Sequence, residues 1–106
     1  RNIAFEILFT GDFLSAEKAL ELMLVNHVVE PDQVLPTAIA LAEKITANAP
    51  LSLAAIKEAS VNGAAMDLER RVAYAQLKRD NVLNSEDAQE GVKAFAEKRQ
   101  PVWKGK

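Results

Sequence analysis

Residues 85–103 read Ser85-Glu86-Asp87-Ala88-Gln89-Glu90-Gly91-Val92-Lys93-Ala94-Phe95-Ala96-Glu97-Lys98-Arg99-Gln100-Pro101-Val102-Trp103. Ser85 suits a helix N-cap, Glu86 and Asp87 favour the positive end of a helix dipole, and Pro101 cannot continue a helix. The pattern predicts a final helix that starts at Ser85 and is stopped by Pro101. Four residues align along it at helical spacing: Ala88, Val92, Phe95 and Arg99. Val92 and Phe95 are expected to pack against other residues and hold the helix in place.

The residues upstream of this segment show the same helical patterning, interrupted by caps, glycines and prolines. Residues 25–29 are the exception, because their β-branched run breaks the helical period and predicts a short strand-like segment. A brief turn is expected at 32–35. We therefore expect a mainly α chain of about six short-to-medium helices; the five before the last lie at 2–9, 16–22, from about 36 to 47, from 50 to about 61, and 68 to about 83.

Length and composition limit the classes of protein to which this chain can belong. At 106 residues there is room for one domain with a modest core, and 49% hydrophobic with 26% charged residues is ordinary for a globular protein. The net charge of −2 gives no reason to expect nucleic acid or an anionic membrane as partner. The chain lacks cysteine and any apolar run near the ~20 residues of a membrane span, and we expect a cytoplasmic protein.

The inventory of catalytic groups is short. His27 is the only histidine and lies in an apolar stretch, so a structural role is favoured over catalysis. The serines fit caps or helix surfaces, the glycines form no phosphate-binding loop, and no metal-ligand set is visible. The basic residues Lys98, Arg99, Lys104 and Lys106 leave two interpretations open: compensation of a helix C-terminus, or binding of an anion such as phosphate.

Alanine-rich helix faces, for example around residues 38–42 and 54–59, allow close packing but bury little apolar area each. A partner surface is therefore expected to supply the remainder. The chain opens on Arg1 directly into a helical pattern, as a fragment would, although a processed or trimmed chain would look the same.

Several motifs occur together in order. They are Glu6-Ile7-Leu8-Phe9-Thr10-Gly11-Asp12-Phe13-Leu14-Ser15-Ala16-Glu17-Lys18-Ala19, Leu24-Val25-Asn26-His27-Val28-Val29, Leu41-Ala42-Glu43-Lys44-Ile45, Ala47-Asn48-Ala49-Pro50-Leu51, Lys57, and the segment from Ser85 to Arg99. In this order and at this spacing the chain resembles, over essentially all of its length, the C-terminal portion of the enoyl-CoA hydratase/isomerase (crotonase) superfamily.

The resemblance implies a parent enzyme of the enoyl-CoA hydratase/isomerase type, a lyase or isomerase that hydrates or isomerises an acyl-CoA thioester, as in fatty acid metabolism. In that family a spiral β/α core carries the CoA pocket, an oxyanion hole that stabilises an enolate, and often two catalytic glutamates. All of these lie upstream in the family's order, so the core is expected to be absent here. We expect no catalytic residue in these 106 residues, no activity of the chain alone, no metal and no covalently bound cofactor.

The resemblance also implies a division of the chain and a set of partners. Residues 1–30 would be the end of the crotonase-like core, and residues 31–106 a C-terminal helical region that serves as lid and oligomerisation surface. The expected partners are the upstream core, neighbouring subunits in a trimer or dimer of trimers, and acyl-CoA. The alternative is a freestanding helical interaction module with no CoA binding. An isolated fragment could also dimerise or swap helices.

Three side chains are implicated in ligand binding by position within the family pattern. Lys98 resembles the lysine that approaches the CoA phosphates, and Phe95 beside it would lie near the adenine. Arg79 falls where relatives place an apolar residue facing the acyl chain. It would either pair with a nearby carboxylate or reach solvent, or it would read an acidic or polar acyl group. Met23 is a second departure, since the family has a glycine there to end a helix.

Overall fold

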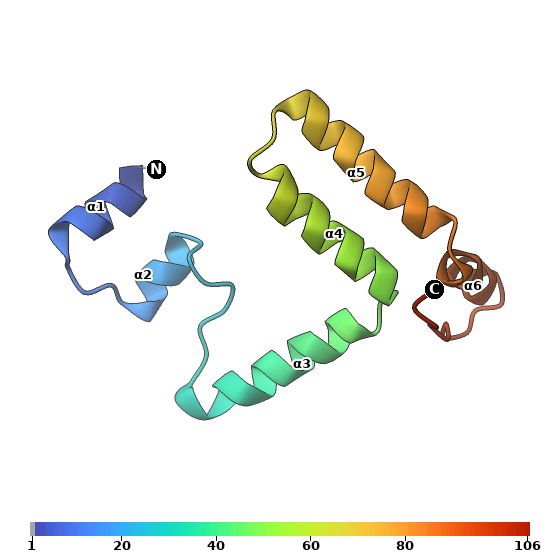
Figure 1. The fold of residues 1–106 in the computed structure, drawn as a ribbon. Coiled ribbons are helices and arrows are strands. Elements are labelled where there is room, and N and C mark those ends of the chain that lie inside the picture. Colours follow the sequence, from blue (N-terminus) through green and yellow to red (C-terminus); the bar gives the residue numbers. More distant parts are fainter. Residues whose placement is uncertain (1) are drawn as a thin grey trace. The chain divides into compact units, whose positions relative to one another are not determined.

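The computed structural model describes residues 2–106, which form two compact units divided between Ala40 and Leu41. The described residues are mainly helical, with no strand, which confirms the predicted fold class (Figure 1). The elements, in chain order, are α1 (Asn2–Thr10), α2 (Ala16–Glu21), the short 3₁₀ helix η1 (Pro31–Gln33), α3 (Val34–Thr46), α4 (Pro50–Gly63), α5 (Leu68–Leu83) and α6 (Glu86–Ala96). The division falls inside α3. The functional boundary expected at residue 30 stays a prediction.

In the first unit, local signals set the ends of α1 and α2. Gly11 adopts a φ of 68° and donates its N–H to the Ile7 carbonyl at 3.1 Å, which ends α1. Ser15 then caps α2, because its hydroxyl accepts the Lys18 N–H at 3.1 Å. Both ends lie where the sequence predicted them.

Met23 ends α2 in the left-handed conformation, with a φ of 57°. Its N–H donates to the Leu20 carbonyl at 2.9 Å, and the Leu24 N–H donates to the Ala19 carbonyl at 2.8 Å. These two bonds form a Schellman motif, in which glycine is usual because a Cβ atom disfavours positive φ. The helix stop is therefore kept despite the methionine, at a cost of roughly 1 kcal/mol.

The segment 25–29, which we expected to be strand-like, forms no strand in the structure of residues 2–106. It follows the turn after α2 as irregular backbone that leads to η1. A strand needs a neighbour for its hydrogen-bond ladder, and β-branched composition alone does not provide one.

The start of α3 differs slightly from the prediction, since the helix begins at Val34 and not near Pro36. Pro36 occupies the third helical position. The N–H groups of the first turn have no partner within a helix, so a proline is tolerated there.

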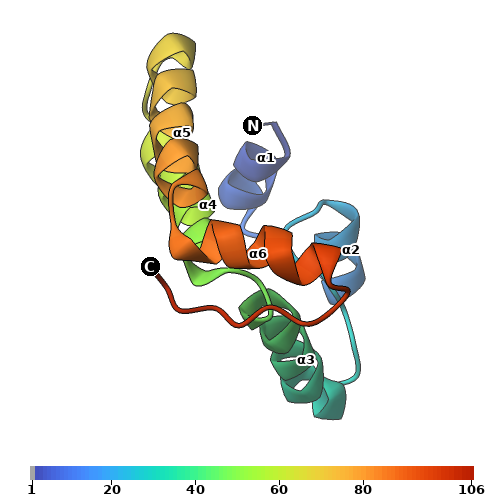
Figure 2. The same cartoon turned by 90° about the vertical axis from the view of Figure 1, so that its right-hand side faces the viewer.

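In the second unit, α4 and α5 lie side by side as an antiparallel pair (Figures 1 and 2). Arg71 of α5 donates to the Gly63 carbonyl at the end of α4, at 2.9 Å, and to the Met66 carbonyl at 3.2 Å. Asp67 caps α5 by accepting the Arg70 N–H at 2.9 Å, as its position predicted. The Arg71 guanidinium thus joins the start of α5 to the end of α4 and to the turn between the two helices.

The final helix α6 starts at the predicted N-cap, where the Ser85 hydroxyl accepts the Ala88 N–H at 3.0 Å. It ends at Ala96, however, well before Pro101, so the prediction that the proline stops the helix was wrong. Lys98 takes a φ of 53° and turns the chain there. As a result Arg99 lies outside the helix and is not part of its stripe.

Little apolar surface is buried within the described residues. Ala94 is the one buried apolar side chain among residues 2–106, and large apolar side chains on every helix of both units are exposed. Val92 and Phe95, which we expected to fasten α6, are 74% and 88% exposed, so in this chain polar contacts hold the helix instead. Across residues 2–106, no single helix is long and apolar enough to cross a membrane; the segments 31–46 and 50–63 reach that length and composition only when taken together as a bent pair.

Candidate ligand-contact site at the C-terminal strap

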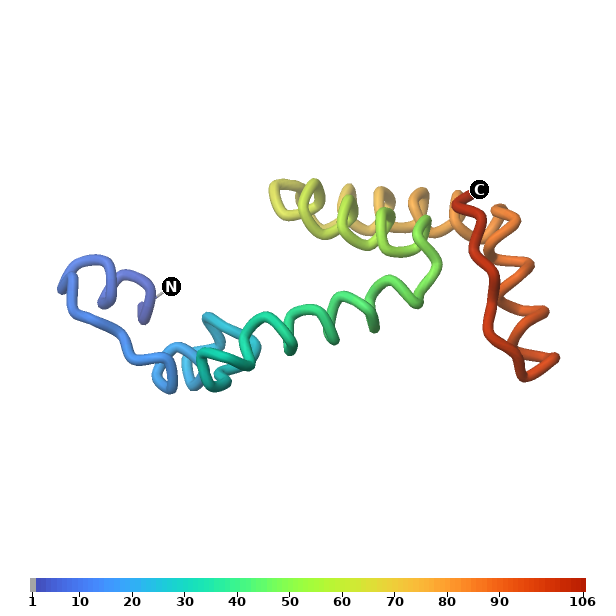
Figure 3. Tube along the Cα trace, turned by 90° about the horizontal axis from the view of Figure 1, so that it is seen from below, coloured from blue at the N-terminus to red at the C-terminus, as the bar shows by residue number. Residues whose placement is uncertain are grey.

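Residues 97–106, here called the strap, fold back along α6 towards its N-terminus (Figures 2 and 3). Asp87, in the first turn of α6, anchors the far end of the strap. Its carboxylate oxygens accept the N–H of Lys104 at 2.7 Å and the N–H of Gly105 at 2.9 Å, while its own N–H donates to the Lys106 carbonyl at 3.1 Å. Asp87 is only 2% exposed, so these bonds compensate the loss of water around the carboxylate.

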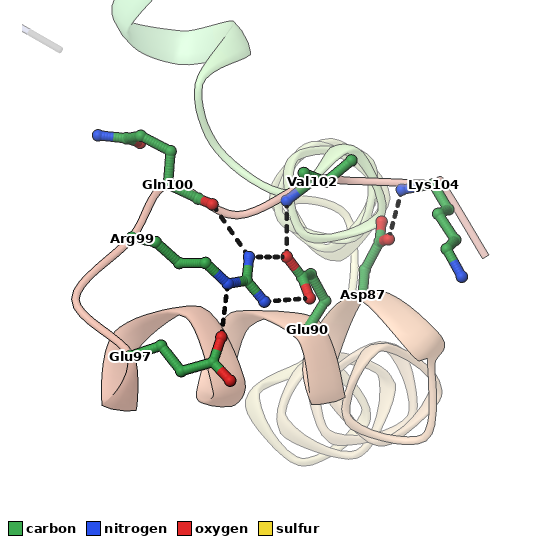
Figure 4. Close-up of polar contacts among 7 residues, drawn as sticks. All are labelled: Asp87, Glu90, Glu97, Arg99, Gln100, Val102 and Lys104. Atoms are coloured by element: carbon green, nitrogen blue, oxygen red, sulfur yellow. Dashed lines mark hydrogen bonds and ion pairs between the residues drawn. The ribbon is translucent and has the colours of Figure 1, made fainter.

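Glu90 and Arg99 anchor the near end of the strap (Figure 4). Two parallel bonds join the guanidinium to the carboxylate, Nη1 to Oε1 at 2.6 Å and Nη2 to Oε2 at 3.0 Å. Glu90 also accepts the Val102 N–H at 2.8 Å. Arg99 further donates to the Glu97 carboxylate at 2.6 Å and to the Gln100 carbonyl at 3.1 Å. We call the side chains of Glu90, Glu97 and Arg99 the ionic clamp.

The clamp changes the titration of Glu90 and Arg99. The hydrogen bonds from Arg99, and next the bond from the Val102 N–H, lower the pKa of Glu90 from 4.5 to about 2. The same contact with Glu90, and a smaller one with Glu97, raises the pKa of Arg99. The two partners are therefore both ionised throughout the neutral pH range.

Trp103 connects the strap to the end of α3. Its indole Nε1–H donates to the Ala47 carbonyl at 2.9 Å. Gly91 makes room for the ring, since a Cβ atom at that position would lie 3.3 Å from the Trp103 Cη2 atom. The glycine within α6 thus permits a close approach of the tryptophan.

The two residues implicated in CoA binding lie within one turn at the end of α6. Lys98 donates its N–H to the Phe95 carbonyl at 3.2 Å, and Arg99 donates its N–H to the Ala94 carbonyl at 3.0 Å. This is the Schellman pattern, with Lys98 at the left-handed position. Both Lys98 and Phe95 are exposed, and Lys98 forms no ion pair with any carboxylate of residues 2–106.

Arg79, the third residue implicated, lies on α5. Its guanidinium pairs with the neighbouring Asp80, Nη2 to Oδ1 at 2.8 Å and Nε to Oδ1 at 3.1 Å, and its side chain is 64% exposed. It lines an open groove of about 310 Å³ between α4 and α5, with an alanine-rich wall. No hydrogen bond or ion pair within residues 2–106 joins Arg79 to Lys98.

Lys78, one residue earlier on α5, lines the same groove. It pairs with Glu58 of α4 and lies 5.4 Å from the centre of the Tyr74 ring. The hydrogen bond and charge of Glu58 raise the pKa of Lys78. Lys78 is therefore engaged in joining α4 to α5.

In the described part of the chain, no three His, Asp or Glu side chains converge to hold a metal ion. His27 is exposed and forms no hydrogen bond found in the structure of residues 2–106. The surface of the chain presents exposed apolar faces and a few cationic side chains. Among these cations, Lys98 lies on the left-handed turn after α6.

Sequence reasoning missed the strap anchors. We assigned Asp87 to the helix dipole alone, and we placed Arg99 on the helix stripe. A signal was present: the acidic Asp87 and Glu90 lie near the start of the predicted helix, and the basic pair Lys98-Arg99 lies near its end. These residues meet only because the chain reverses at Lys98. The reversal was not predicted, because a lysine and not a glycine occupies the left-handed position.

Comparison with known proteins identifies the family. The family model described as enoyl-CoA hydratase/isomerase matches residues 1–106. Among curated relatives, an (E)-benzylidenesuccinyl-CoA hydratase from Thauera aromatica is 44% identical over 103 residues, which are 97% of this chain and 40% of that protein. A carnitinyl-CoA dehydratase from Salmonella agona (strain SL483) is 44% identical over 108 residues, covering 98% of this chain and 41% of the relative.

Solved structures agree with these matches. An enoyl-CoA hydratase from Mycobacterium marinum superimposes with a TM-score of 0.94 at 48% identity, over 99% of this chain and 42% of the other. An enoyl-CoA hydratase from Bacillus anthracis gives a TM-score of 0.96 at 37% identity, over 100% of this chain and 41% of the other.

The helices described above are therefore those of the C-terminal helical region of a crotonase fold. The chain belongs to the enoyl-CoA hydratase/isomerase family. It spans about 40% of the length of the curated relatives that it matches.

Proposed function

We propose that this chain is the C-terminal part of an enzyme that adds water to, or removes water from, an acyl-CoA thioester. The relatives support this proposal, because one is named as a hydratase and another as a dehydratase of CoA thioesters. Hydration and dehydration are one reaction run in two directions. The chain's own part would be to cover and assemble the enzyme in the cytoplasm, while residues outside these 106 perform the chemistry.

The observation that carries this division is the exposure of apolar side chains. Only Ala94 is buried among the apolar side chains of residues 2–106, whereas Phe13 and Phe95 are almost fully accessible. Apolar faces of this extent usually mark a surface that another protein segment covers. A lid over the acyl pocket and an interface between subunits are the two roles that we assign to these faces.

Activity assays test the division directly. The purified 106-residue chain should not hydrate crotonyl-CoA, whereas the full-length protein, meaning this chain joined to the upstream region that its relatives have, should process a CoA thioester. Hydration of crotonyl-CoA by the 106-residue chain alone would refute the division.

We assign Lys98 and Phe95 to the CoA itself, with the lysine at a phosphate and the phenylalanine near the adenine. Lys98 is exposed, lacks an ion pair and lies one turn from Phe95, which supports the assignment. In the full-length protein, Lys98→Ala should weaken CoA binding and leave binding of pantetheine, which lacks the phosphates, unchanged. Lys93→Ala is the matched control, since it removes a lysine from the same helix. Unchanged CoA affinity in Lys98→Ala would favour the alternative, a helical interaction module that binds no CoA.

For Arg79 the proposed role is contact with an acidic acyl group. Its position on the groove between α4 and α5 supports this role, as does the name of one relative, whose succinyl thioester carries a second carboxyl group. The ion pair with Asp80 competes with it. Arg79→Met in the full-length protein should lower kcat/KM more for a carboxylated acyl-CoA than for a plain one, and Asp80→Asn should not. Equal effects on both substrates would reject the role.

A further inference from the structure

The backbone of Lys98 is held in a conformation that a lysine does not favour. Its φ of 53° is left-handed, and glycine is the usual residue at this position of a Schellman motif. A residue with a Cβ atom persists there only where its surroundings hold it, and such outliers cluster at functional sites.

The surroundings of Lys98 differ from those of the other non-glycine residue with positive φ. Met23 ends α2 with the same pair of backbone bonds, but its neighbours Leu22 and Leu24 have apolar side chains that form no ion pair. At Met23 the two backbone bonds alone hold the turn, so charged neighbours are an additional restraint that distinguishes Lys98. Around Lys98, by contrast, the two adjacent residues are bonded to each other, since Arg99 Nε donates to Glu97 Oε2 at 2.6 Å.

The ionic clamp ties this turn to the body of α6 (Figure 4). Arg99 reaches back nine residues to Glu90 through two bonds of 2.6 and 3.0 Å, a fork that only a guanidinium provides. The Glu90 side chain is itself only 20% exposed and also accepts the Val102 N–H. The residues on both sides of Lys98 are thus restrained, because Arg99 is bonded to Glu90 of α6 and to Glu97.

The clamp also engages the acceptor nearest to Lys98 in sequence. The Glu97 carboxylate is bonded to Arg99, and Lys98 forms no ion pair with any carboxylate that the structure describes. An ammonium without a carboxylate partner remains available to a phosphate.

We infer that Glu90 and Arg99 are positioning residues that hold Lys98 in place for a phosphate group of CoA. The inference rests on the proposed function, because it gives a cause for the geometry of the proposed phosphate contact. Neither positioning residue is required to touch the ligand; both act through the backbone of Lys98.

A double-mutant cycle in the full-length protein tests the inference, with dissociation constants for CoA and for pantetheine measured by calorimetry. Lys98→Ala should weaken CoA binding roughly fivefold, which is the upper range for a single exposed charge pair. Arg99→Lys keeps the positive charge but loses the fork, and it should weaken CoA binding by about threefold. In the Lys98→Ala background, Arg99→Lys should have no further effect, and neither change should alter binding of pantetheine.

Glu90→Gln provides a second route, because it removes the charge opposite Arg99 while leaving an oxygen for the Val102 N–H. It should reproduce the effect of Arg99→Lys, and again only when Lys98 is present. A melting temperature for each variant separates loss of the fold from loss of positioning, since a general loss of stability would weaken pantetheine binding as well.

Two results would overturn the inference in distinguishable ways. If Lys98→Ala weakens CoA binding and Arg99→Lys weakens it by the same factor with and without Lys98, the arginine acts independently and the positioning role fails alone. If Lys98→Ala leaves CoA affinity unchanged, the phosphate contact fails, and the positioning role fails with it.

Discussion

The attachment of the far end of the strap to α6 depends on the buried Asp87 carboxylate, and Asp87→Asn is the change that tests this dependence. The two carboxylate oxygens each accept one backbone N–H, from Lys104 at 2.7 Å and from Gly105 at 2.9 Å. Asparagine is nearly the same size but offers one oxygen and one NH₂ group. One of the two backbone N–H groups would therefore face a donor in place of an acceptor.

The size of the effect follows from the kind of bond that is lost. Hydrogen bonds to charged groups contribute about 1.5–3 kcal/mol each, and a buried donor left without a partner costs a similar amount. We expect Asp87→Asn to weaken attachment of the far end of the strap by about 2 kcal/mol, which corresponds to a roughly thirtyfold increase in its detached fraction.

Hydrogen exchange measures this fraction directly. The Lys104 and Gly105 amides should exchange roughly thirtyfold faster in the Asp87→Asn variant than in the unaltered chain. Trp103 is the only tryptophan of the chain, so its fluorescence emission reports the same detachment as a shift to longer wavelength.

Glu86→Gln is the matched control. Glu86 precedes Asp87 in the first turn of α6 and pairs only with the Lys104 ammonium, at 3.0 Å on the surface. It should leave the two amides protected, because exposed ion pairs contribute little. The reasoning is refuted if Asp87→Asn does not accelerate exchange, if both variants accelerate it equally, or if the two amides are unprotected in the unaltered chain.

Three further outcomes are expected. The pKa of Glu90 is lowered from 4.5 to about 2, chiefly by Arg99, so the stabilisation of the strap by this pair is present above pH 4.5 and is lost as the pH falls from 4.5 towards 2. Trp103 fluorescence should follow that loss, and Glu90→Gln should remove the part that depends on pH; an identical titration in the variant would contradict this. Gly91→Leu should displace the Trp103 ring and shift its fluorescence emission, because even a Cβ atom added at position 91 would lie 3.3 Å from the ring. Gly91→Ala should shift the emission little. Equal spectra for both variants would contradict the contact. Met23→Gly should raise the free energy of unfolding, measured by urea denaturation, by about 0.5 kcal/mol. The change relieves a φ of 57°, but glycine also has a greater entropy in the unfolded chain, which offsets part of the gain. Met23→Ala is the control and should not raise the free energy of unfolding.

The starts of α2, α5 and α6 were predictable because their causes are local. Ser15, Asp67 and Ser85 each accept the N–H of the residue three positions later, and each of these bonds spans less than one turn. The mainly helical fold class and the family were predictable for the same reason: short motifs in a fixed order carry both.

Helix ends were harder to predict. Gly11 was recognised because glycine favours positive φ, but Lys98 adopts the same conformation without that signal. The end of α6 was therefore placed at Pro101, several residues too late. The strand-like interpretation of residues 25–29 failed because strand formation depends on a neighbouring strand.

The candidate contact residues illustrate the same limit. Lys98 and Phe95 were selected by their place in a family pattern, and the structure shows them exposed within one turn. Their roles in binding stay predictions. Glu90, which we now connect to Lys98, was not selected, because its partner Arg99 lies nine residues away and meets it only after the chain reverses.

The sequence by itself determined the helical class, the caps and the family, since each depends on residues within a few positions of one another. Only the tertiary structure decided how the chain's last ten residues are held. Asp87 meets Gly105 across 18 residues, and Trp103 meets Ala47 across 56. Contacts at such separations form only when the intervening chain takes one particular path, and that path is set by many weak local preferences acting together, not by the identity of the two residues that meet.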